Sequence, residues 1–118
     1  MDLFKFQDYR DYLIQRGRSL PGGGRGELQR LAEAARVHPS VITVVLQGAR
    51  ELTLEQAQAL AEYFEFTELE ERYFLFLVQF ARAGTQKLKR TFERQLRELR
   101  EARSELVNRL PVSSKLSD

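Results

Sequence analysis

The side chains that most often do chemistry are sparse in this sequence of 118 residues. It has one histidine, His38, and no cysteine, so a metal ion would have to be held by carboxylates around a single imidazole, which is an unusual ligand set. The acidic residues are not clustered with a histidine or a nucleophile, and the glycines of residues 22–26 lack the Lys-Ser/Thr of a phosphate-binding loop. We therefore expect no catalytic site, no metal and no cofactor.

Residues 27–48 carry the most specific pattern in the sequence. Leu28, Leu31, Ala32 and Ala35 have helical spacing, and the spacing breaks at Val37. Pro39 suits the first position of a new helix, because its missing N–H is not needed there, and Gly48 is a typical residue just after a helix end. The β-branched run of residues 41–46 could also be a strand, but no second strand is available to pair with it. The sequence predicts two short helices joined by a tight turn.

Helical periodicity also governs the rest of the chain. Residues 2–18 have an aromatic face and predict an amphipathic helix, whereas the proline and glycines of residues 19–26 predict a mobile loop. Thr53 with Gln56 and Thr67 with Glu70 have the spacing of capping boxes, so each pair predicts a helix start. We expect an all-α bundle of about five helices over residues 1–84, a long helix over residues 85–110, and a disordered tail over residues 111–118.

The long helix carries a narrow apolar stripe among many charged residues. Its members are Leu88, Phe92, Leu96, Leu99 and Leu106. Such a stripe must be buried, either against the chain's own bundle or against a second copy. The sequence leaves both open, and a homodimer through this helix is one of the two expectations.

Charge is unevenly distributed along the chain. Residues 1–50 have a net charge of +3, residues 51–80 of −6, and residues 81–118 of +5. Basic segments on either side of an acidic one favour a dipolar surface with a face for a polyanion, although charged helices can also simply be solvated. The N-terminus lacks the basic start and apolar run of a signal peptide, and no stretch is apolar enough to span a membrane. We expect a cytoplasmic protein that does not enter a membrane.

The segment from Leu31 to Gly48 resembles a helix-turn-helix of the lambda-repressor-like (XRE) type, with Ala32 as the small residue where two helices touch. Phe6-Gln7-Asp8-Tyr9-Arg10-Asp11-Tyr12-Leu13 and Glu70-Glu71-Arg72-Tyr73-Phe74-Leu75 look like the N-terminal domain of a family of bacterial putative transcriptional regulators. Together the resemblance covers about residues 4–103. It implies a lambda-repressor-like helix-turn-helix bundle and a DNA-binding role in transcription regulation.

The resemblance also implies which residues meet double-stranded DNA. It places a recognition helix at residues 39–47, in the major groove, with Pro39 at its head. The base-contact residues expected on it are Ser40, Val41, Thr43, Val44 and Gln47. The phosphate contacts expected around it are Arg25, Arg30, Arg36 and Arg50.

Three features depart from that pattern and keep a second function open. Arg36 stands where the turn usually has glycine, and Leu28 stands where such repressors often have a phosphate-binding glutamine. The expected recognition helix also has no Arg, Lys or Asn, which make the commonest bidentate contacts to bases. An apolar face at Val41 and Val44 would suit a protein partner instead. The alternative is therefore a protein-interaction domain that reuses the same fold.

Overall fold

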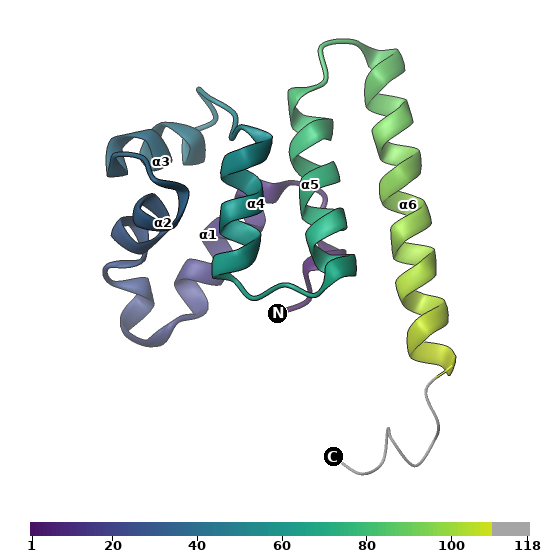
Figure 1. Ribbon diagram of the computed structural model, residues 1–118, viewed down its shortest axis with the longest axis horizontal. Coiled ribbons are helices and arrows are strands. Elements are labelled where there is room, and N and C mark those ends of the chain that lie inside the picture. The colour runs from purple at the N-terminus through teal and green to yellow at the C-terminus, as the bar shows by residue number, and fades with distance from the viewer. Residues whose placement is uncertain (110–118) are drawn as a thin grey trace.

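A computed structural model describes residues 1–109 of the chain. Within that range the fold is all-helical, as Figure 1 shows. The elements are two short 3-10 segments, η1 (Leu3–Lys5) and η2 (Pro21–Gly24), and the α-helices α1 (Tyr9–Ser19), α2 (Glu27–Ala35), α3 (Pro39–Leu46), α4 (Leu54–Tyr63), α5 (Glu68–Arg82) and α6 (Gln86–Arg109). Leu110, expected to end the last helix, and the tail expected at residues 111–118 lie outside the described residues.

The first helix is shorter than its periodicity predicts. The structure divides residues 2–18 into η1 and α1 because two aspartates each cap their own segment. Asp2 accepts a hydrogen bond from the N–H of Phe4 at 3.0 Å, and Asp8 accepts one from the N–H of Arg10 at 2.8 Å. An aspartate that bonds the backbone two residues ahead favours a helix start over a helix interior. The expectation of one continuous helix was therefore wrong.

The glycine-rich connection after α1 forms a compact turn, η2. Gly22, Gly23 and Gly24 all have positive φ, a conformation that glycine adopts at little cost. Gly24 is further constrained, because a Cβ there would lie 2.2 Å from the carbonyl oxygen of Gly17. The turn therefore depends on a close backbone approach that other residues would block.

The core is aromatic and lies between α1, α4 and α5. Tyr9, Tyr73 and Phe74 are completely buried, and the rings of Tyr12 and Phe64 pack edge-on with centroids 5.9 Å apart. Both predicted capping boxes are present: Thr53 with Gln56 starts α4, and Thr67 with Glu70 starts α5. These local signals fix where the core helices begin.

Helices α5 and α6 form an antiparallel pair at the end of the molecule that is farthest from α3 (Figure 1). Phe92 on α6 packs against Phe76 on α5 with ring centroids 6.1 Å apart, and Leu96 and Leu99 are buried. Leu88 and Leu106 remain exposed. The stripe thus divides into a part that the bundle covers and a part that it leaves uncovered. None of the helices among residues 1–109 is long and apolar enough to span a membrane.

Candidate nucleic-acid interface

Helices α2 and α3 are joined by a turn of three residues, Arg36–Val37–His38. Arg36 adopts the left-handed conformation, with φ 59° and ψ 45°, at the position where the sequence pattern usually has glycine. The N–H of Val37 then donates to the carbonyl oxygen of Ala32 at 2.9 Å, which closes the end of α2. Val37 packs against the core below the turn. The turn is therefore anchored from inside, and Arg36 is exposed at its surface.

His38 caps the start of α3. Its Nδ1 accepts a hydrogen bond from the N–H of Ser40 at 3.1 Å and lies 2.9 Å from the hydroxyl oxygen of the same residue. Pro39 is the first residue of the helix, as its chemistry predicts. The one histidine of the chain thus has a structural role in orienting α3.

The two sides of α3 differ in burial. Ile42 and Val45 are buried against the core, while Ser40 and Gln47 on the opposite side are exposed. Val41, Thr43 and Val44 are partly buried between these two sides. The valine pair is therefore less exposed than the expectation of a solvent-facing apolar surface requires.

The hydroxyls expected to contact bases are engaged within the chain. Thr43 donates from its hydroxyl to the carbonyl oxygen of Pro39 at 3.3 Å, and the hydroxyl of Ser40 contacts His38. A threonine hydroxyl bonded to the preceding turn keeps its lone pairs for a second partner. Thr43 can thus still accept a hydrogen bond from the exocyclic amine of a base.

The four candidate phosphate contacts fall into two groups. Arg25, Arg36 and Arg50 are exposed, and within residues 1–109 their guanidinium groups form no ion pair. Arg30 instead donates from Nε to Glu27 at 3.1 Å and from Nη2 to the carbonyl oxygen of Arg25 at 3.1 Å. The hydrogen bond to Glu27 raises the pKa of Arg30 above its ordinary value. Arg30 is therefore less available to a phosphate than the other three.

Sequence reasoning missed the residue that holds α2 in place. Glu27 is buried, with 5% of its surface exposed, and its carboxylate accepts hydrogen bonds from Arg16 at 2.6 Å, Arg30 at 3.1 Å and the Tyr63 hydroxyl at 3.0 Å. Burial, reinforced by Glu27, raises the pKa of Tyr63. Partners on α1, α2 and α4 thus meet at the first residue of α2. The sequence signal was weak, because a glutamate in a first helical turn usually serves the helix dipole in solvent.

Sequence reasoning also missed Arg10, which holds the end of α3 and the segment after it. It donates from Nε to the carbonyl oxygen of Val45 at 2.6 Å and from Nη2 to the carbonyl oxygen of Arg50 at 2.9 Å. The same Nη2 donates to Glu51 at 2.7 Å. These contacts span about forty residues of sequence, so no local pattern could have indicated them.

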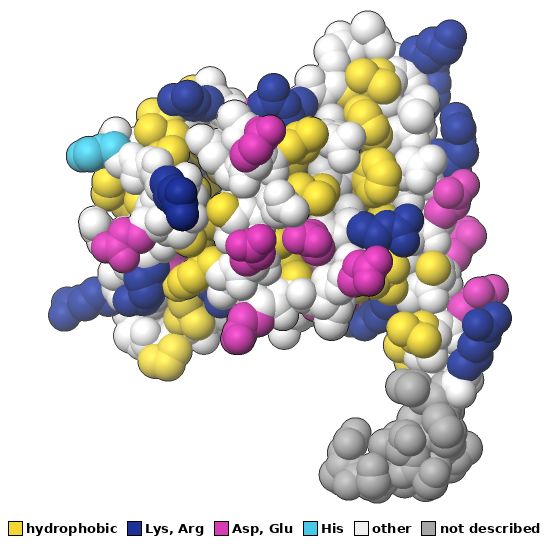
Figure 2. Space-filling model, viewed as in Figure 1, with side chains coloured by type: hydrophobic (Ala, Val, Ile, Leu, Met, Phe, Trp, Pro, Cys, Tyr) yellow, Lys and Arg dark blue, Asp and Glu magenta, His cyan; other side chains and the backbone are white. Residues whose placement is uncertain are grey.

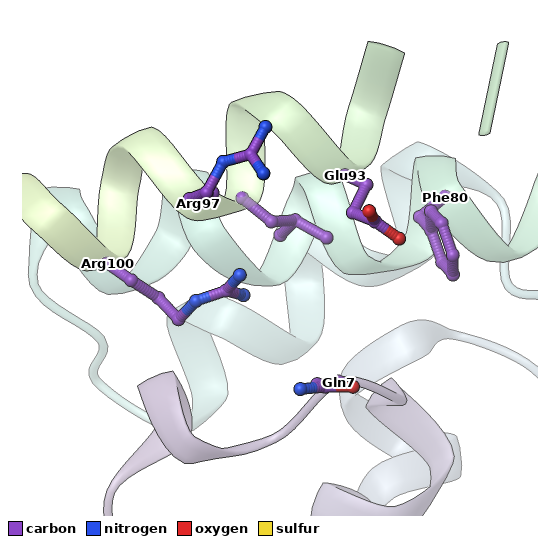
Figure 3. Close-up of a pocket in the computed structure, with 6 residues that line it drawn as sticks. Gln7, Phe80, Glu93, Arg97 and Arg100 are labelled. Atoms are coloured by element: carbon purple, nitrogen blue, oxygen red, sulfur yellow. The ribbon is translucent and has the colours of Figure 1, made fainter. Parts of the chain in front are cut away.

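A cavity of about 320 Å³ lies away from α3, where α6 faces the segment between η1 and α1 (Figure 3). Arg97 and Arg100 line it together with Gln7, Phe80 and Glu93. Arg100 donates to the Tyr73 hydroxyl at 3.1 Å, and Tyr73 donates to the carbonyl oxygen of Phe6 at 2.8 Å. Arg100 is thus tied to the bundle and helps to hold the N-terminal segment.

Comparison with known proteins identifies no relative: no protein-family model, no curated protein and no solved structure matches the chain. Among residues 1–109, no group of three or more potential metal ligands comes together.

Proposed function

We propose that this protein is a lambda-repressor-like helix-turn-helix module of a transcriptional regulator, with α3 as the helix that enters the major groove of double-stranded DNA. The observation that carries the proposal is the position of two arginines. Arg36 comes just before α3 and Arg50 just after it, and both guanidinium groups are exposed and lack an ion pair within the described residues. Cations at both ends of a short outward helix fit phosphates on the two sides of a groove.

The contacts that hold the two ends of α3 also support the proposal. His38 caps its start, and Arg10 holds the carbonyl oxygen of Val45 near its end. A helix that reads base edges must be held rigidly, because a contact is lost when its donor moves by about 1 Å. The exposed side of α3 then offers Ser40 and Gln47 for polar contacts. The partly buried Thr43 adds a hydroxyl beside them, and the partly buried Val41 and Val44 offer methyl groups to a thymine methyl. A role on chromosomal DNA also implies a cytoplasmic location.

Binding to a random-sequence duplex at two salt concentrations tests the proposal. Phosphate contacts release counterions, so the affinity should fall steeply as salt rises. Arg50→Ala should weaken binding to every sequence and lower the salt slope by about one ion. Lys5→Ala removes an exposed cation from η1 and serves as the matched control, with no change expected. No binding to any duplex at low salt would overturn the proposal.

Contacts to bases are tested on a preferred sequence selected from a random pool. Thr43→Ala should cost about 1–3 kcal/mol on that sequence and little on random duplex. The change also removes the hydrogen bond to Pro39, so the thermal unfolding of the variant must be measured beside its binding. Equal losses on both duplexes, with an unchanged fold, would show that Thr43 does not read sequence.

A second candidate is a protein-interaction domain, and the composition of α3 favours it. The helix has no lysine, arginine or asparagine, and Val41 and Val44 leave part of their surface uncovered. Val41→Asp combined with Val44→Asp should then abolish capture of a protein partner, because a charge does not fit a dry apolar contact. Partner capture that survives the double variant, together with salt-dependent duplex binding, would decide for DNA.

A further inference from the structure

We propose that two copies of the chain pair through antiparallel α6 helices, with Leu88 of each copy seated in a cavity between α5 and α6 of its partner. Three observations lead to this pairing. Leu88 is exposed near the start of α6, a partly apolar cavity lies near the end of the same helix, and the two halves of α6 carry mainly opposite charges.

The bundle leaves apolar side chains of α6 uncovered at both ends of the helix. Leu88 is 42% exposed near its start, and Leu106 and Val107 are 57% and 41% exposed near its end. Leu88 and Leu106 lie five helical turns apart, so they occupy the same face. In an antiparallel pair the start of each helix lies beside the end of the other, so Leu88 of one copy can cover Leu106 of its partner, and this contact occurs twice.

The end of that face opens into a cavity of about 390 Å³. Its apolar lining comes from Leu69 on α5 and from Ala102 and Leu106 on α6, and its charged lining comes from Glu68 and Arg72 on α5 and from Glu105 and Arg109 on α6. The small side chain of Ala102 keeps the space open between larger neighbours. A leucine from a second molecule would pack on the apolar side chains of this cavity, with charged residues around it, in the manner of knobs-into-holes packing between helices.

The outer surface of α6 changes sign along the helix. On the first half the exposed charges are mainly basic, with Lys87, Arg90, Arg94 and Arg97 against Glu93. On the second half they are mainly acidic, with Glu98, Glu101 and Glu105 against Arg109, which lies 3.9 Å from Glu105. Lys87, Arg90 and Arg94 repeat at spacings of three and four residues, as do Glu98, Glu101 and Glu105, so each of these sets forms a stripe. Figure 2 shows basic side chains along the outer edge of α6 near the α5–α6 turn, acidic ones farther along, and a basic one again at the end of the helix.

This division of charge selects the antiparallel orientation. In a parallel pair each basic half would face its own copy, whereas in an antiparallel pair it faces the acidic half of the partner. A pair centred near Arg97 brings Arg94 beside the partner's Glu101 and Arg90 beside the partner's Glu105. The same register brings Leu88 to the partner's Leu106. Surface ion pairs add little affinity each, but they exclude the wrong orientation, while the leucines supply the buried area.

The pairing also determines where the two copies of α3 lie. The cavity is on the flank of α6 beside α5, so the two molecules meet face to face. The two-fold axis of an antiparallel helix pair is perpendicular to both helices and to the line between them. For molecules that meet face to face, this axis runs along the longest axis of each molecule, from α6 toward α3 (Figure 1). Both copies of α3 then lie at one end of the dimer and can approach one duplex. Only this consequence rests on the proposed DNA-binding function.

Sedimentation of the full chain without DNA tests the pairing independently of DNA binding. The wild type should be a dimer at micromolar concentration, and Leu88→Asp should raise the dissociation constant at least about tenfold. Leu54→Asp is the matched control, since Leu54 is 40% exposed on α4, away from α6, and its substitution should leave the dimer intact. Circular dichroism shows whether each variant is folded. A wild-type monomer, or equal effects of the two substitutions, would overturn the proposal.

Orientation is tested by charge exchange and by cross-linking. Arg94→Glu should weaken the dimer, and Arg94→Glu combined with Glu101→Arg should restore it. Because the chain has no cysteine, single cysteines report on the register directly. Glu98→Cys lies near the two-fold axis and should form an intermolecular disulfide, whereas two copies of Thr91→Cys would lie about 18 Å apart along the helix pair and should not. In a parallel pair both cysteines would face their own copy, so a disulfide through Thr91→Cys would establish that orientation and overturn the proposal.

Discussion

The guanidinium group of Arg10 donates from Nε to the carbonyl oxygen of Val45 at 2.6 Å, which ties the first turn of α1 to the last turn of α3. The last carbonyl oxygens of a helix lack partners within the helix, so an arginine from elsewhere can satisfy them and bring positive charge to the negative end of the dipole. Arg10 also reaches Arg50 and Glu51, and its side chain is only 14% exposed. Helix α1 therefore acts as a brace that sets the direction of α3.

Replacing this brace should affect both stability and the end of α3. Arg10→Ala leaves the carbonyl oxygen of the buried Val45 and the half-buried carboxylate of Glu51 without this donor, so we expect the free energy of unfolding to fall by about 1–3 kcal/mol. Urea denaturation measures this loss, and hydrogen exchange of the Gln47 and Gly48 amides should become faster. Arg18→Ala on the same helix removes an exposed arginine and should change little. Equal losses of stability in the two variants would show that the hydrogen bonds of Arg10 do not stabilise the end of α3.

Glu27 should be more important for folding than an ordinary helix glutamate. Glu27→Ala removes the carboxylate that Arg16, Arg30 and Tyr63 share, and breaking a buried ion pair from one side costs about 3–5 kcal/mol. Glu33→Ala, an exposed glutamate on the same helix, should change stability by no more than about 0.5 kcal/mol. The two variants are compared by chemical denaturation, and a loss for Glu27→Ala as small as that for Glu33→Ala would show that the shared carboxylate does not stabilise the fold.

The features that sequence predicted are those set by neighbours along the chain. The capping boxes at Thr53 and Thr67, the start of α3 at Pro39 and the turn after it at Gly48 all depend on residues two to four positions away, and the structure has each of them. The left-handed conformation of Arg36 is also local, since any residue in that turn must adopt it. The all-α class follows from the same signals.

The features that sequence could not provide depend on contacts between distant segments. Arg10 meets Glu51 across 41 positions, and Glu27 meets Tyr63 across 36, so no spacing rule could relate them. The apolar stripe of α6 was ambiguous for the same reason. Whether Leu96 is covered and Leu88 is not depends on where α5 lies beside the helix. The DNA-contact residues remain predictions, because their role depends on a partner and not on the fold.

Strain at Arg36 gives a prediction that separates stability from function. The left-handed conformation costs a non-glycine residue about 1 kcal/mol, so Arg36→Gly should leave the unfolding free energy unchanged or raise it by up to about 1 kcal/mol. If Arg36 contacts phosphate, the same change should weaken duplex binding. Glu65 has a similar φ of 57° between α4 and α5, and Glu65→Gly should have the same effect on stability without changing DNA binding. Thermal unfolding and fluorescence anisotropy measure the two effects, and unaltered duplex binding by Arg36→Gly would remove Arg36 from the interface.

Alkaline pH should destabilise the fold through its buried tyrosines. Tyr9 is completely buried, donates to Glu51 at 2.8 Å and accepts from the N–H of Leu52 at 3.2 Å. Burial is the main cause that raises the pKa of Tyr9 well above its ordinary value of 10.0, and burial likewise raises the pKa of Tyr12. The neutral phenol is therefore favoured in the folded state, while the unfolded chain loses its phenolic protons near pH 10.

The sign of the effect follows from these pKa values. The stabilisation is fully present below pH 10 and is lost as the pH rises above it, at about 1.4 kcal/mol per pH unit for each tyrosine that stays protonated only in the folded state. Urea denaturation at pH 8 and at pH 11 should therefore show a loss of stability in the wild type. Tyr9→Phe should be less stable at pH 8, because its hydrogen bonds are gone, yet it should lose less between the two pH values. Equal losses in both proteins would show that Tyr9 ionises in the folded state as readily as in the unfolded chain.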